Sequence, residues 1–329
     1  MKAVVCTKYG PPEILQIVEV EKPTPKDNEV LIKVYATTVS AADQRVRSFT
    51  VPVYFWLPAR LMLGIRRPRK PILGMEFSGE IESVGKDVGL FKKGDKVFAV
   101  TLQTFGAYAE YKCLPEDGPI GLKPTNTPYE EAAAIPIGAR TALHYLKEIG
   151  NIKPEQKVLI YGASGSVGTY AVQLAKYFGA EVTGVCSKAN LDLVDSLGAD
   201  HVIDYTRPDF TENFKTYDII FITIDKCPFM VCKKALSKNG IYLNIGRPML
   251  SLHMMWTSFT SKKKIVVGVN APETAQALTV LKRMIEEGQL KPVIDRNYTF
   301  DQIVEAHRYV DKGHKKGNVV ITVDHGLSK

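Results

Sequence analysis

The spacing of hydrophobic residues between positions 157 and 187 predicts a strand, a tight turn, a helix and a second strand. Residues 158–160 form a continuous apolar run, which is typical of a strand buried on both faces. From 170 to 178 the apolar residues recur at helical spacing, and Gly179 ends the helix. A β-rich run follows at 181–185. The pattern predicts a strand–helix–strand unit of a parallel sheet.

The N-terminal part of the chain has a different pattern. Short runs rich in Val, Ile and Leu alternate with Gly and Pro, which is typical of a barrel-like β domain. A short helix is predicted at 41–48. The predicted strands are 2–6, 15–20, 29–38, 77–84, 96–100 and 108–112.

From residue 128 the pattern becomes helical, and after 187 helices alternate with strands. This alternation predicts an open, doubly wound α/β sheet. The predicted helices are 130–134, 137–147, 190–197, 230–236, 273–287 and 301–312. The predicted strands are 201–203, 218–222, 240–245, 264–269 and 318–323. We expect a β domain at 1–125, to which 300–329 returns, and a nucleotide domain at 126–299.

Two apolar stretches interrupt these patterns, at 49–70 and at 249–261. Exposed apolar loops serve as lids, dimer surfaces or membrane contacts. Ordinary loop packing or a dimer contact, a substrate lid and membrane contact all remain open for them. We hypothesise that 49–70 is a mobile cover of the substrate cleft, with Trp56 as its test residue.

Composition narrows the class of protein. The chain has 329 residues, which favours two domains over one. Its five scattered cysteines suit reduced thiols, and with no signal peptide or membrane-spanning run we expect a cytoplasmic protein. Membrane contact is the least favoured of the alternatives for the two apolar stretches. The net charge is +8, with basic clusters at 66–70, 262–264 and 315–316. These clusters are solvated loops or attract anionic ligands such as a phosphorylated dinucleotide. No DNA-recognition motif accompanies them.

Three glycines at three-residue spacing occupy the predicted turn. Gly162 permits a sharp exit from the strand, Gly165 lets the backbone approach a pyrophosphate, and Gly168 lets helix and strand pack closely. The N-terminus of the following helix directs N–H groups at the phosphates. The turn as a whole is predicted to bind the cofactor through Gly162, Ala163, Ser164, Gly165, Ser166, Val167 and Gly168.

The end of the second strand indicates NADPH rather than NADH. Enzymes that prefer NAD carry an acidic residue about 20 residues past the glycine motif, where it holds the ribose 2′-OH. Residues 186–190 contain no acid, and Ser187 and Lys188 suit a 2′-phosphate instead. Tyr205, at the end of the third strand, is placed to contact the adenosine.

Five segments in order resemble the medium-chain dehydrogenase/reductase superfamily, and in particular its zinc-free, quinone-oxidoreductase-like (zeta-crystallin-like) branch. They are 1–20, 74–99 (GMEFSGEIESVGKDVGLFKKGDKVFA), 132–146, 162–168 (GASGSVG) and 197–205 (LGADHVIDY). The resemblance implies a GroES-like β-barrel catalytic domain, a Rossmann domain, a cleft between them and a homodimer. It further implies a nicotinamide site lined by Thr141, Ile245, Gly246 and Val269, with Lys316 and Asn318 near the cofactor.

The departures from the family concern the reaction centre. Zinc-dependent members carry a Cys and a His where this chain has Ser40 and Met75, so the resemblance implies no metal. Among the substrate-side positions, Arg47 and Asp43 are carried over, while Arg45 replaces a common Tyr. The candidate catalytic residues are therefore Ser40, Arg47 and Tyr54, with Phe105 beside them in the pocket.

Without a metal, hydride transfer is easiest to the β-carbon of a conjugated carbonyl, because charge spreads onto an enolate or quinol oxygen that one hydroxyl can stabilise. The leading hypothesis is an NADPH-dependent oxidoreductase of quinones or α,β-unsaturated carbonyls. A 2-enoyl-thioester reductase is the first alternative. A catalytically silent NADPH-binding protein that acts by RNA binding is the second.

Overall fold

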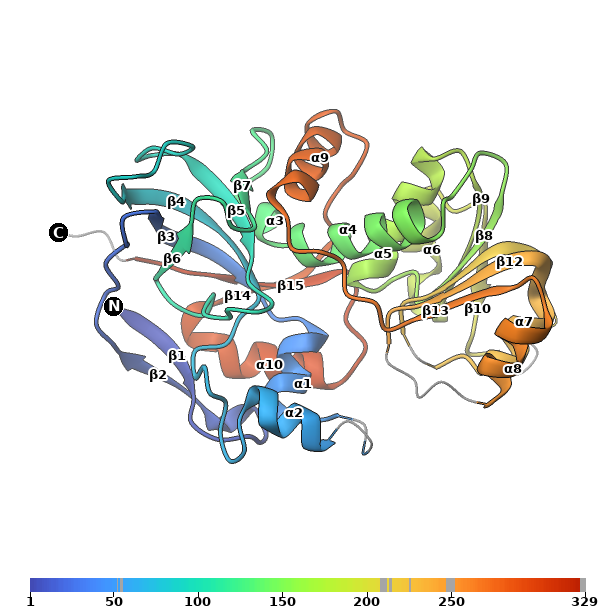
Figure 1. Ribbon diagram of the computed structural model, residues 1–329, viewed down its shortest axis with the longest axis horizontal. Coiled ribbons are helices and arrows are strands. Elements are labelled where there is room, and N and C mark those ends of the chain that lie inside the picture. The colour runs from blue at the N-terminus through green and yellow to red at the C-terminus, as the bar shows by residue number, and fades with distance from the viewer. Residues whose placement is uncertain are drawn as a thin grey trace. The chain divides into compact units, whose positions relative to one another are not determined.

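The computed structural model describes residues 1–51, 53, 56–207, 212, 215–224, 226–246 and 252–325. The chain forms two compact units (Figure 1). Unit 1 comprises Met1–Ile137, Glu273–Glu286 and Pro292–Lys329, and unit 2 comprises Gly138–Pro272 and Glu287–Lys291. Unit 1 therefore takes in a late helix, 275–286, that the sequence pattern assigned to the nucleotide domain.

Unit 1 is built on a seven-stranded sheet with the order β14-β15-β3-β4-β5-β7, and β6 pairs with β3. Neighbouring strands are antiparallel except for β14 and β15. The strands are β3 (Glu29–Thr38), β4 (Glu76–Val84), β5 (Lys96–Val100), β6 (Tyr111–Pro115), β7 (Ile120–Leu122), β14 (Ile294–Thr299) and β15 (Asn318–Thr322). A separate hairpin joins β1 (Lys2–Cys6) and β2 (Leu15–Glu19).

The last strand returns to the N-terminal sheet, as the sequence predicted. β15 pairs antiparallel with β3, with Val320 opposite Thr38 (Figure 1). The core on this sheet is fully buried and includes Val34, Phe77 and Ile321. The helices of this unit are α1 (Ala41–Ser48), α2 (Trp56–Leu63), α3 (Tyr129–Ala133), α9 (Ala275–Glu286) and α10 (Ile303–Asp311), with 3₁₀ turns at Pro12–Ile14 and Phe300–Gln302.

Unit 2 is a doubly wound α/β layer. Its six strands are all parallel and have the order β10-β9-β8-β11-β12-β13. They are β8 (Lys157–Tyr161), β9 (Glu181–Cys186), β10 (His201–Asp204), β11 (Tyr217–Ile222), β12 (Leu236–Asn244) and β13 (Lys264–Val267). Because the order reverses at β8, the carboxyl end of β8 is the point where such sheets bind ligands.

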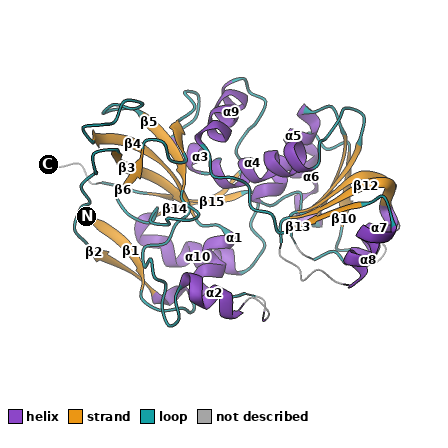
Figure 2. Ribbon diagram, in the orientation of Figure 1, coloured by secondary structure: helices purple, strands orange, loops and turns teal. Residues whose placement is uncertain are grey.

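Helices cover both faces of this sheet (Figure 2). The helices α5 (Ser166–Tyr177) and α6 (Leu191–Ser196) lie on one face, and α7 (Phe229–Ala235) and α8 (Leu252–Thr260) lie on the other. A further helix, α4 (Pro136–Leu143), continues into a π-helical turn at His144–Ile149. The predicted fold class, a GroES-like β unit plus a doubly wound parallel sheet, is confirmed.

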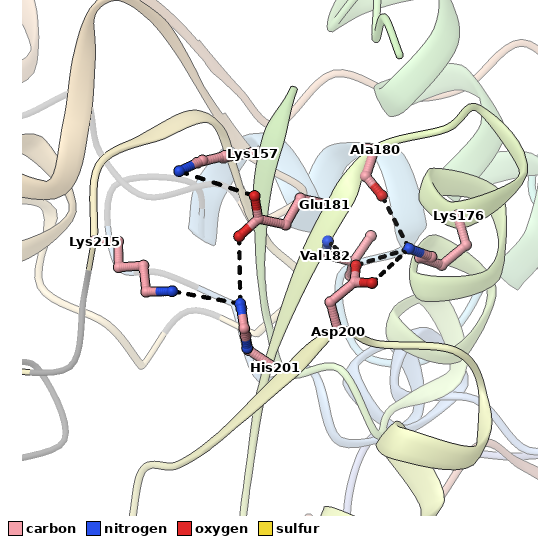
Figure 3. A network of polar contacts seen from close by, with 8 residues as sticks. All are labelled: Lys157, Lys176, Ala180, Glu181, Val182, Asp200, His201 and Lys215. Atoms are coloured by element: carbon pink, nitrogen blue, oxygen red, sulfur yellow. Dashed lines mark hydrogen bonds and ion pairs between the residues drawn. The ribbon is translucent and has the colours of Figure 1, made fainter. Parts of the chain in front are cut away.

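A polar network holds the amino ends of three of these strands together (Figure 3). Glu181 bridges Lys157 (3.9 Å) and His201 (3.3 Å) across β8, β9 and β10. Beside it, the Asp200 carboxylate accepts hydrogen bonds from Lys176 Nζ (2.8 Å) and from the backbone N–H of Val182 (2.7 Å). These pairs are half-exposed, so each contributes little. They lie at the edge of the sheet opposite the carboxyl end of β8.

The two apolar stretches that the sequence pattern gave as loops contain helices. α2 lies within 49–70 and α8 within 249–261. Each helix is rich in Leu, Met or Trp, and neither contains an acidic residue. α2 has one polar side chain, Arg60, among its eight residues, so its helical period cannot be detected from polarity.

Candidate functional site

The glycine turn after β8 is fixed by close packing at two of its three glycines. Gly162 has φ +83°, and a Cβ there would lie 2.6 Å from Thr223 Oγ1. That hydroxyl lies 2.9 Å from the carbonyl oxygen of Tyr161 and 3.0 Å from that of Gly162. A Cβ on Gly168 would lie 2.1 Å from Gly162 O. The fold itself therefore requires glycine at 162 and at 168.

Gly165 differs from the other two glycines. It caps α5 with φ −82°, which any residue adopts, and a Cβ there would meet only Gly162 O, at 3.5 Å. The fold thus leaves room for a side chain at this position, and glycine keeps that room open. The N-terminus of α5, a twelve-residue helix, lies beside this space. Open space beside a long helix's N-terminus fits the pyrophosphate of a dinucleotide.

Asn190 joins the turn to the loop after β9, and sequence reasoning missed it. Its Nδ2 donates to Ser164 Oγ (3.0 Å) and to Ser187 Oγ (3.2 Å), and the residue is 8% exposed. Its Oδ1 is buried and has no hydrogen-bond partner among the residues that the structure describes. Asn190 therefore positions two predicted cofactor contacts, while Lys188 beside it is exposed.

An acidic residue stands at the predicted adenosine end, where Thr206 and the backbone of Lys188 are its partners. Asp204, at the end of β10, accepts hydrogen bonds from Thr206 Oγ1 (2.7 Å) and Thr206 N (2.9 Å), which lower its pKa. The next residue, Tyr205, donates its backbone N–H to Cys186 O (3.0 Å) and lies with its ring 6.1 Å from that of Tyr161. Tyr205 is thus held beside the end of β9, where Ser187 follows.

Four further predicted cofactor residues lie in unit 2. Ile245 and Gly246 follow β12, and their N–H groups donate to Ile222 O (3.1 Å) and to Asn244 Oδ1 (2.7 Å). Val269 follows β13 with 41% of its surface exposed, and Thr141 is half-buried on α4. Ile245 and Gly246 thus follow the carboxyl end of the same sheet that carries the glycine turn.

The last two predicted cofactor residues belong to unit 1. Lys316 is exposed, and its backbone N–H donates to Asp295 Oδ2 (2.9 Å). Asn318 is 3% exposed, and its Nδ2 donates to Val293 O (3.2 Å) at the start of β15. The role of both residues toward the cofactor stays a prediction.

Ser40 and Asp43 form a capping box at the start of α1. The Ser40 hydroxyl donates to Asp43 Oδ2 (2.6 Å) and accepts from the Asp43 N–H (3.2 Å). Asp43 is fully buried, and its burial raises its pKa to about 6 although the Ser40 hydrogen bonds act against this. When Asp43 is ionised, the Ser40 hydroxyl therefore donates its hydrogen bond to the Asp43 carboxylate. When Asp43 is protonated, the Ser40 hydroxyl is available to donate to another acceptor.

A second buried carboxyl lies in the same unit. Glu76, at the start of β4, accepts hydrogen bonds from Thr38 Oγ1 (2.6 Å) and from the N–H of Ile137 in the first turn of α4 (2.7 Å). Burial raises the pKa of Glu76 to about 7; the Asp43 charge adds to this, while the Lys315 charge opposes it. Burial lowers the pKa of Lys315 to about 8. The unit thus contains two carboxyls that titrate near neutral pH.

Arg47 has a structural role that the prediction of a substrate contact did not include. Its side chain is 1% exposed and makes a two-pronged ion pair with both oxygens of Asp311 (2.7 Å each), at the end of α10. It also donates to Gly10 O (2.7 Å). The Arg47 guanidinium thus connects α1 to α10 through a buried ion pair. Because its donors bind these partners, we do not retain Arg47 as a catalytic candidate.

Two other substrate-side predictions have different outcomes. Tyr54 lies outside the described residues, so its role stays a prediction. Phe105 is 9% exposed and has φ +52°, an uncommon conformation for a bulky side chain that is concentrated at functional sites. Backbone strain at Phe105 is compatible with the pocket position that was predicted for it.

The residues at the positions of the family's zinc ligands do not fit that metal. Met75 is 3% exposed, and Ser40 is engaged with Asp43; zinc in proteins takes mainly Cys, His and carboxylate ligands. Throughout the described part of the chain, no three His, Cys, Asp or Glu side chains are grouped as a metal site would require. No described helix is long and apolar enough to cross a membrane.

A pocket of about 370 Å³ lies along the edge strand β10. His201, Asp204, Arg207 and Lys215 contribute to its lining. None of the predicted cofactor or catalytic residues lines it, so we do not assign it to the candidate site.

Comparison with known proteins gives consistent matches over the whole chain. A family described as "Alcohol dehydrogenase GroES-like domain" matches residues 26–124, and one described as "Zinc-binding dehydrogenase" matches 197–321. The chain is 34% identical to the chloroplastic quinone-oxidoreductase QR1 of Triphysaria versicolor, with 98% of each chain covered. It is 30% identical to the mitochondrial NAD(P)H oxidoreductase RTN4IP1 of Mus musculus, over 98% of this chain and 89% of that one.

Among solved structures, the JamJ enoyl reductase (apo form) has a TM-score of 0.86 at 26% identity, with 98% of this chain and 99% of that one covered. Both relatives named above are organellar proteins, so the cytoplasmic location of this chain stays a prediction. The homodimer likewise stays a prediction.

Proposed function

Because the chain belongs to the medium-chain dehydrogenase/reductase superfamily, as a quinone-oxidoreductase-like member, we propose that it reduces quinones or α,β-unsaturated carbonyls with NADPH. Members of this superfamily use nicotinamide cofactors. The choice of NADPH, the independence from zinc and the substrate class belong to the proposal.

The observation that carries the proposal is the open position at Gly165. Gly162 and Gly168 are explained by packing inside unit 2, whereas a Cβ at Gly165 would have only one neighbour, at 3.5 Å. A bound group that approaches the backbone closely explains why this position has no side chain. The N-terminus of α5 beside it favours an anionic group.

The loop after β9 supports NADPH as the dinucleotide. Lys188 is exposed, and the Ser187 hydroxyl accepts a hydrogen bond from Asn190. A cation and an oriented hydroxyl are therefore adjacent in this loop. The acid at the end of the next strand, Asp204, accepts hydrogen bonds from Thr206 and from the backbone N–H of Lys188, so it does not take the place of an acid that holds a ribose 2′-OH at the end of β9. A lysine with three donors binds a 2′-phosphate as a point charge.

The reaction that we propose needs few protein groups. NADPH, when bound, supplies the hydride. The substrate oxygen gains negative charge as the hydride reaches the β-carbon, and the Ser40 hydroxyl is the donor that we assign to it. Protonated Asp43 can donate a hydrogen bond to Ser40 Oγ, which leaves the Ser40 hydroxyl free to donate to the substrate oxygen. Water then supplies the proton that completes the reduced product. The lack of a fitting group of zinc ligands among the residues that the structure describes supports a reaction without a Lewis acid.

A 2-enoyl-thioester reductase is the second candidate, and α2 favours it. Leu57, Leu61 and Met62 are 62%, 56% and 60% exposed, and Arg66, Arg67, Arg69 and Lys70 follow as exposed cations. An acyl chain on a phosphate-bearing carrier offers complementary chemistry to an apolar surface beside a basic one. The solved enoyl reductase of similar fold supports this alternative.

The test of the proposed function is NADPH binding by Gly165→Ala. Since the fold tolerates this methyl group, we expect unchanged thermal stability and a Kd for NADPH that rises about tenfold or more, as for a lost hydrogen bond to a charged group. Gly168→Ala is the matched control. It should lose stability by about 1–3 kcal/mol, because its Cβ would clash with Gly162 O. Unchanged NADPH binding by folded Gly165→Ala would contradict the proposed cofactor site.

A further inference from the structure

Two cysteines meet at the start of α7, outside the site described above. Pro228 is the N-cap of this helix, so Cys227 is the residue before the cap and Cys232 is the fourth residue of the helix. Side chains at these two positions commonly pack against each other and fix the entry of the chain into the helix. Here the two Sγ atoms are 3.3 Å apart, with the Cys232 thiol donating to Cys227. In the reduced protein the pair is a thiol–thiol contact that replaces the usual apolar one.

We propose that Cys227 and Cys232 are a redox modification site that forms a reversible intramolecular disulfide. A disulfide has an S–S length of about 2.05 Å, so the sulfurs must approach by about 1.3 Å. Cys227 stands in the segment before the helix, where a small backbone shift can supply this movement. The bond would close a loop of only six residues, within one element, without rearranging the sheet.

Cys227 differs from the four other cysteines in its electrostatics. The hydrogen bond that Cys232 donates to Cys227 raises the pKa of the Cys232 thiol. Burial raises the pKa values of the Cys6 and Cys113 thiols to about 11 and that of Cys186 to about 12. The S–H of Cys232 instead lowers the pKa of Cys227, because it donates to the Cys227 sulfur. The thiolate is the reactive form in oxidation, so Cys227 is the thiol that reacts first and Cys232 is the one that resolves it.

The oxidant that fits the site is a small peroxide. Cys227 and Cys232 are 5% and 0% exposed, and they pack among Tyr161, Ile222 and Tyr242. The Cys227 thiolate attacks the O–O bond of hydrogen peroxide, which gives a sulfenic acid and one water once a proton is taken up. The Cys232 sulfur then attacks the Cys227 sulfur, breaks the S–O bond and releases a second water. The two thiols lose two electrons and two protons, and a dithiol reductant reverses the step.

The position of the pair connects it to the nucleotide turn. Thr223, four residues before Cys227, contacts the carbonyl oxygens of Tyr161 and Gly162 and so holds the turn. A disulfide at Cys227 fixes the chain shortly after this contact. We expect oxidation to change the Kd for NADPH severalfold; this consequence rests on the proposed function, whereas formation of the disulfide does not.

The experiment uses the full chain, first reduced and then freed of reductant. After treatment with hydrogen peroxide, the remaining thiols are alkylated and the protein is digested with trypsin. Cleavage after Lys226 and Lys233 releases both cysteines in one peptide, 227–233. We expect this peptide to carry no alkyl group and to be lighter by two hydrogen atoms, and dithiothreitol to restore two alkylatable thiols.

Variants identify the partners. Cys227→Ser and Cys232→Ser should each prevent the mass loss, and Cys113→Ser, which removes a half-buried cysteine from unit 1, should not affect it. If a variant fails to fold, the wild-type chain is equilibrated in glutathione buffers instead. The alkylation of peptide 227–233 then shows whether the disulfide forms. The proposal is overturned if peptide 227–233 stays doubly alkylated while Cys113 or another cysteine is oxidised. Since this readout needs no nucleotide, it is independent of whether NADPH binds.

Discussion

At the residue scale, the Ser40 hydroxyl serves both the fold and the proposed reaction. It caps α1 and donates to Asp43. Ser40→Ala should therefore cost about 1 kcal/mol of stability through the lost cap. It should also lower kcat for enone or quinone reduction on the order of 10²- to 10³-fold, as for one lost oxyanion donor, without abolishing turnover.

Ser40→Thr is the matched variant, because it keeps the hydroxyl, and it should restore most of both losses. The rate of the wild type should fall as the pH rises through about 6, where Asp43 ionises and its carboxylate accepts the hydrogen bond of the Ser40 hydroxyl. A kcat that is unchanged in Ser40→Ala would exclude Ser40 as the donor.

We predict that Lys188 determines the choice of cofactor. Lys188→Ala should raise the KM for NADPH by about tenfold and leave the KM for NADH unchanged, since only NADPH carries the 2′-phosphate. Lys226→Ala is the control, because it removes a lysine of unit 2 outside the predicted cofactor residues. Comparable kcat/KM for NADH and NADPH in the wild type would contradict the preference.

The cofactor residues were more accessible to sequence reasoning than the catalytic ones. Gly162 and Gly168 follow a strand at fixed spacing, so their packing role is local and could be predicted. Asn190 could not be, because one of its partners, Ser164, is 26 positions away. The ion pair of Arg47 could not be predicted for the same reason: its partner Asp311 is 264 positions away, and a buried ion pair and a substrate contact use the same residue type.

At the element scale, Glu76 joins β3, β4 and the start of α4, and this contact depends on pH. Its pKa is about 7 in the folded chain and about 4 in the unfolded one. Between these values the folded chain binds the proton more tightly, so the free energy of unfolding falls as the pH rises from about 4 to about 7. Asp43, whose pKa is also raised, acts in the same direction.

Glu76→Gln should flatten this dependence, which urea unfolding at several pH values measures. Glu82→Gln, on the same strand with a side chain that is 34% exposed, should keep the slope of the wild type. A slope that is the same in all three proteins would show that Glu76 does not titrate in this range.

Most elements could be predicted because their periodicity is local. α1 was predicted with its observed bounds, 41–48, because it begins with a capping Ser and ends in a basic turn. β14 was not predicted: four of its six residues, IDRNYT, are polar, and its pairing with β15 is what makes it a strand. The predicted strand at 108–112 begins three residues later, as β6, because Tyr108 is instead buried in the core, where its hydroxyl donates to Thr38 O (3.2 Å).

At the scale of the whole molecule, the chemistry is divided between the two units. Unit 2 supplies the nucleotide turn and the loop after β9, and unit 1 supplies Ser40 and two buried carboxyls. Under the proposed function, the orientation of the hydride acceptor against the bound dinucleotide provides much of the acceleration. No single side chain then needs to be indispensable.

The last prediction follows from this division and concerns the substrate class. A hydride acceptor whose charge spreads over a conjugated system needs one hydroxyl donor, whereas a saturated carbonyl needs a strong electrophile such as a metal ion. We expect the purified chain to oxidise NADPH with quinones and enones at kcat/KM values about 10²-fold or more above those for saturated aldehydes. Metal chelators should leave these rates unchanged.

Enoyl thioesters in the same panel separate the two candidate functions, since the second predicts that they are the best substrates. Faster reduction of simple aldehydes than of quinones and enones, or stoichiometric zinc with activity lost on chelation, would contradict the zinc-independent assignment.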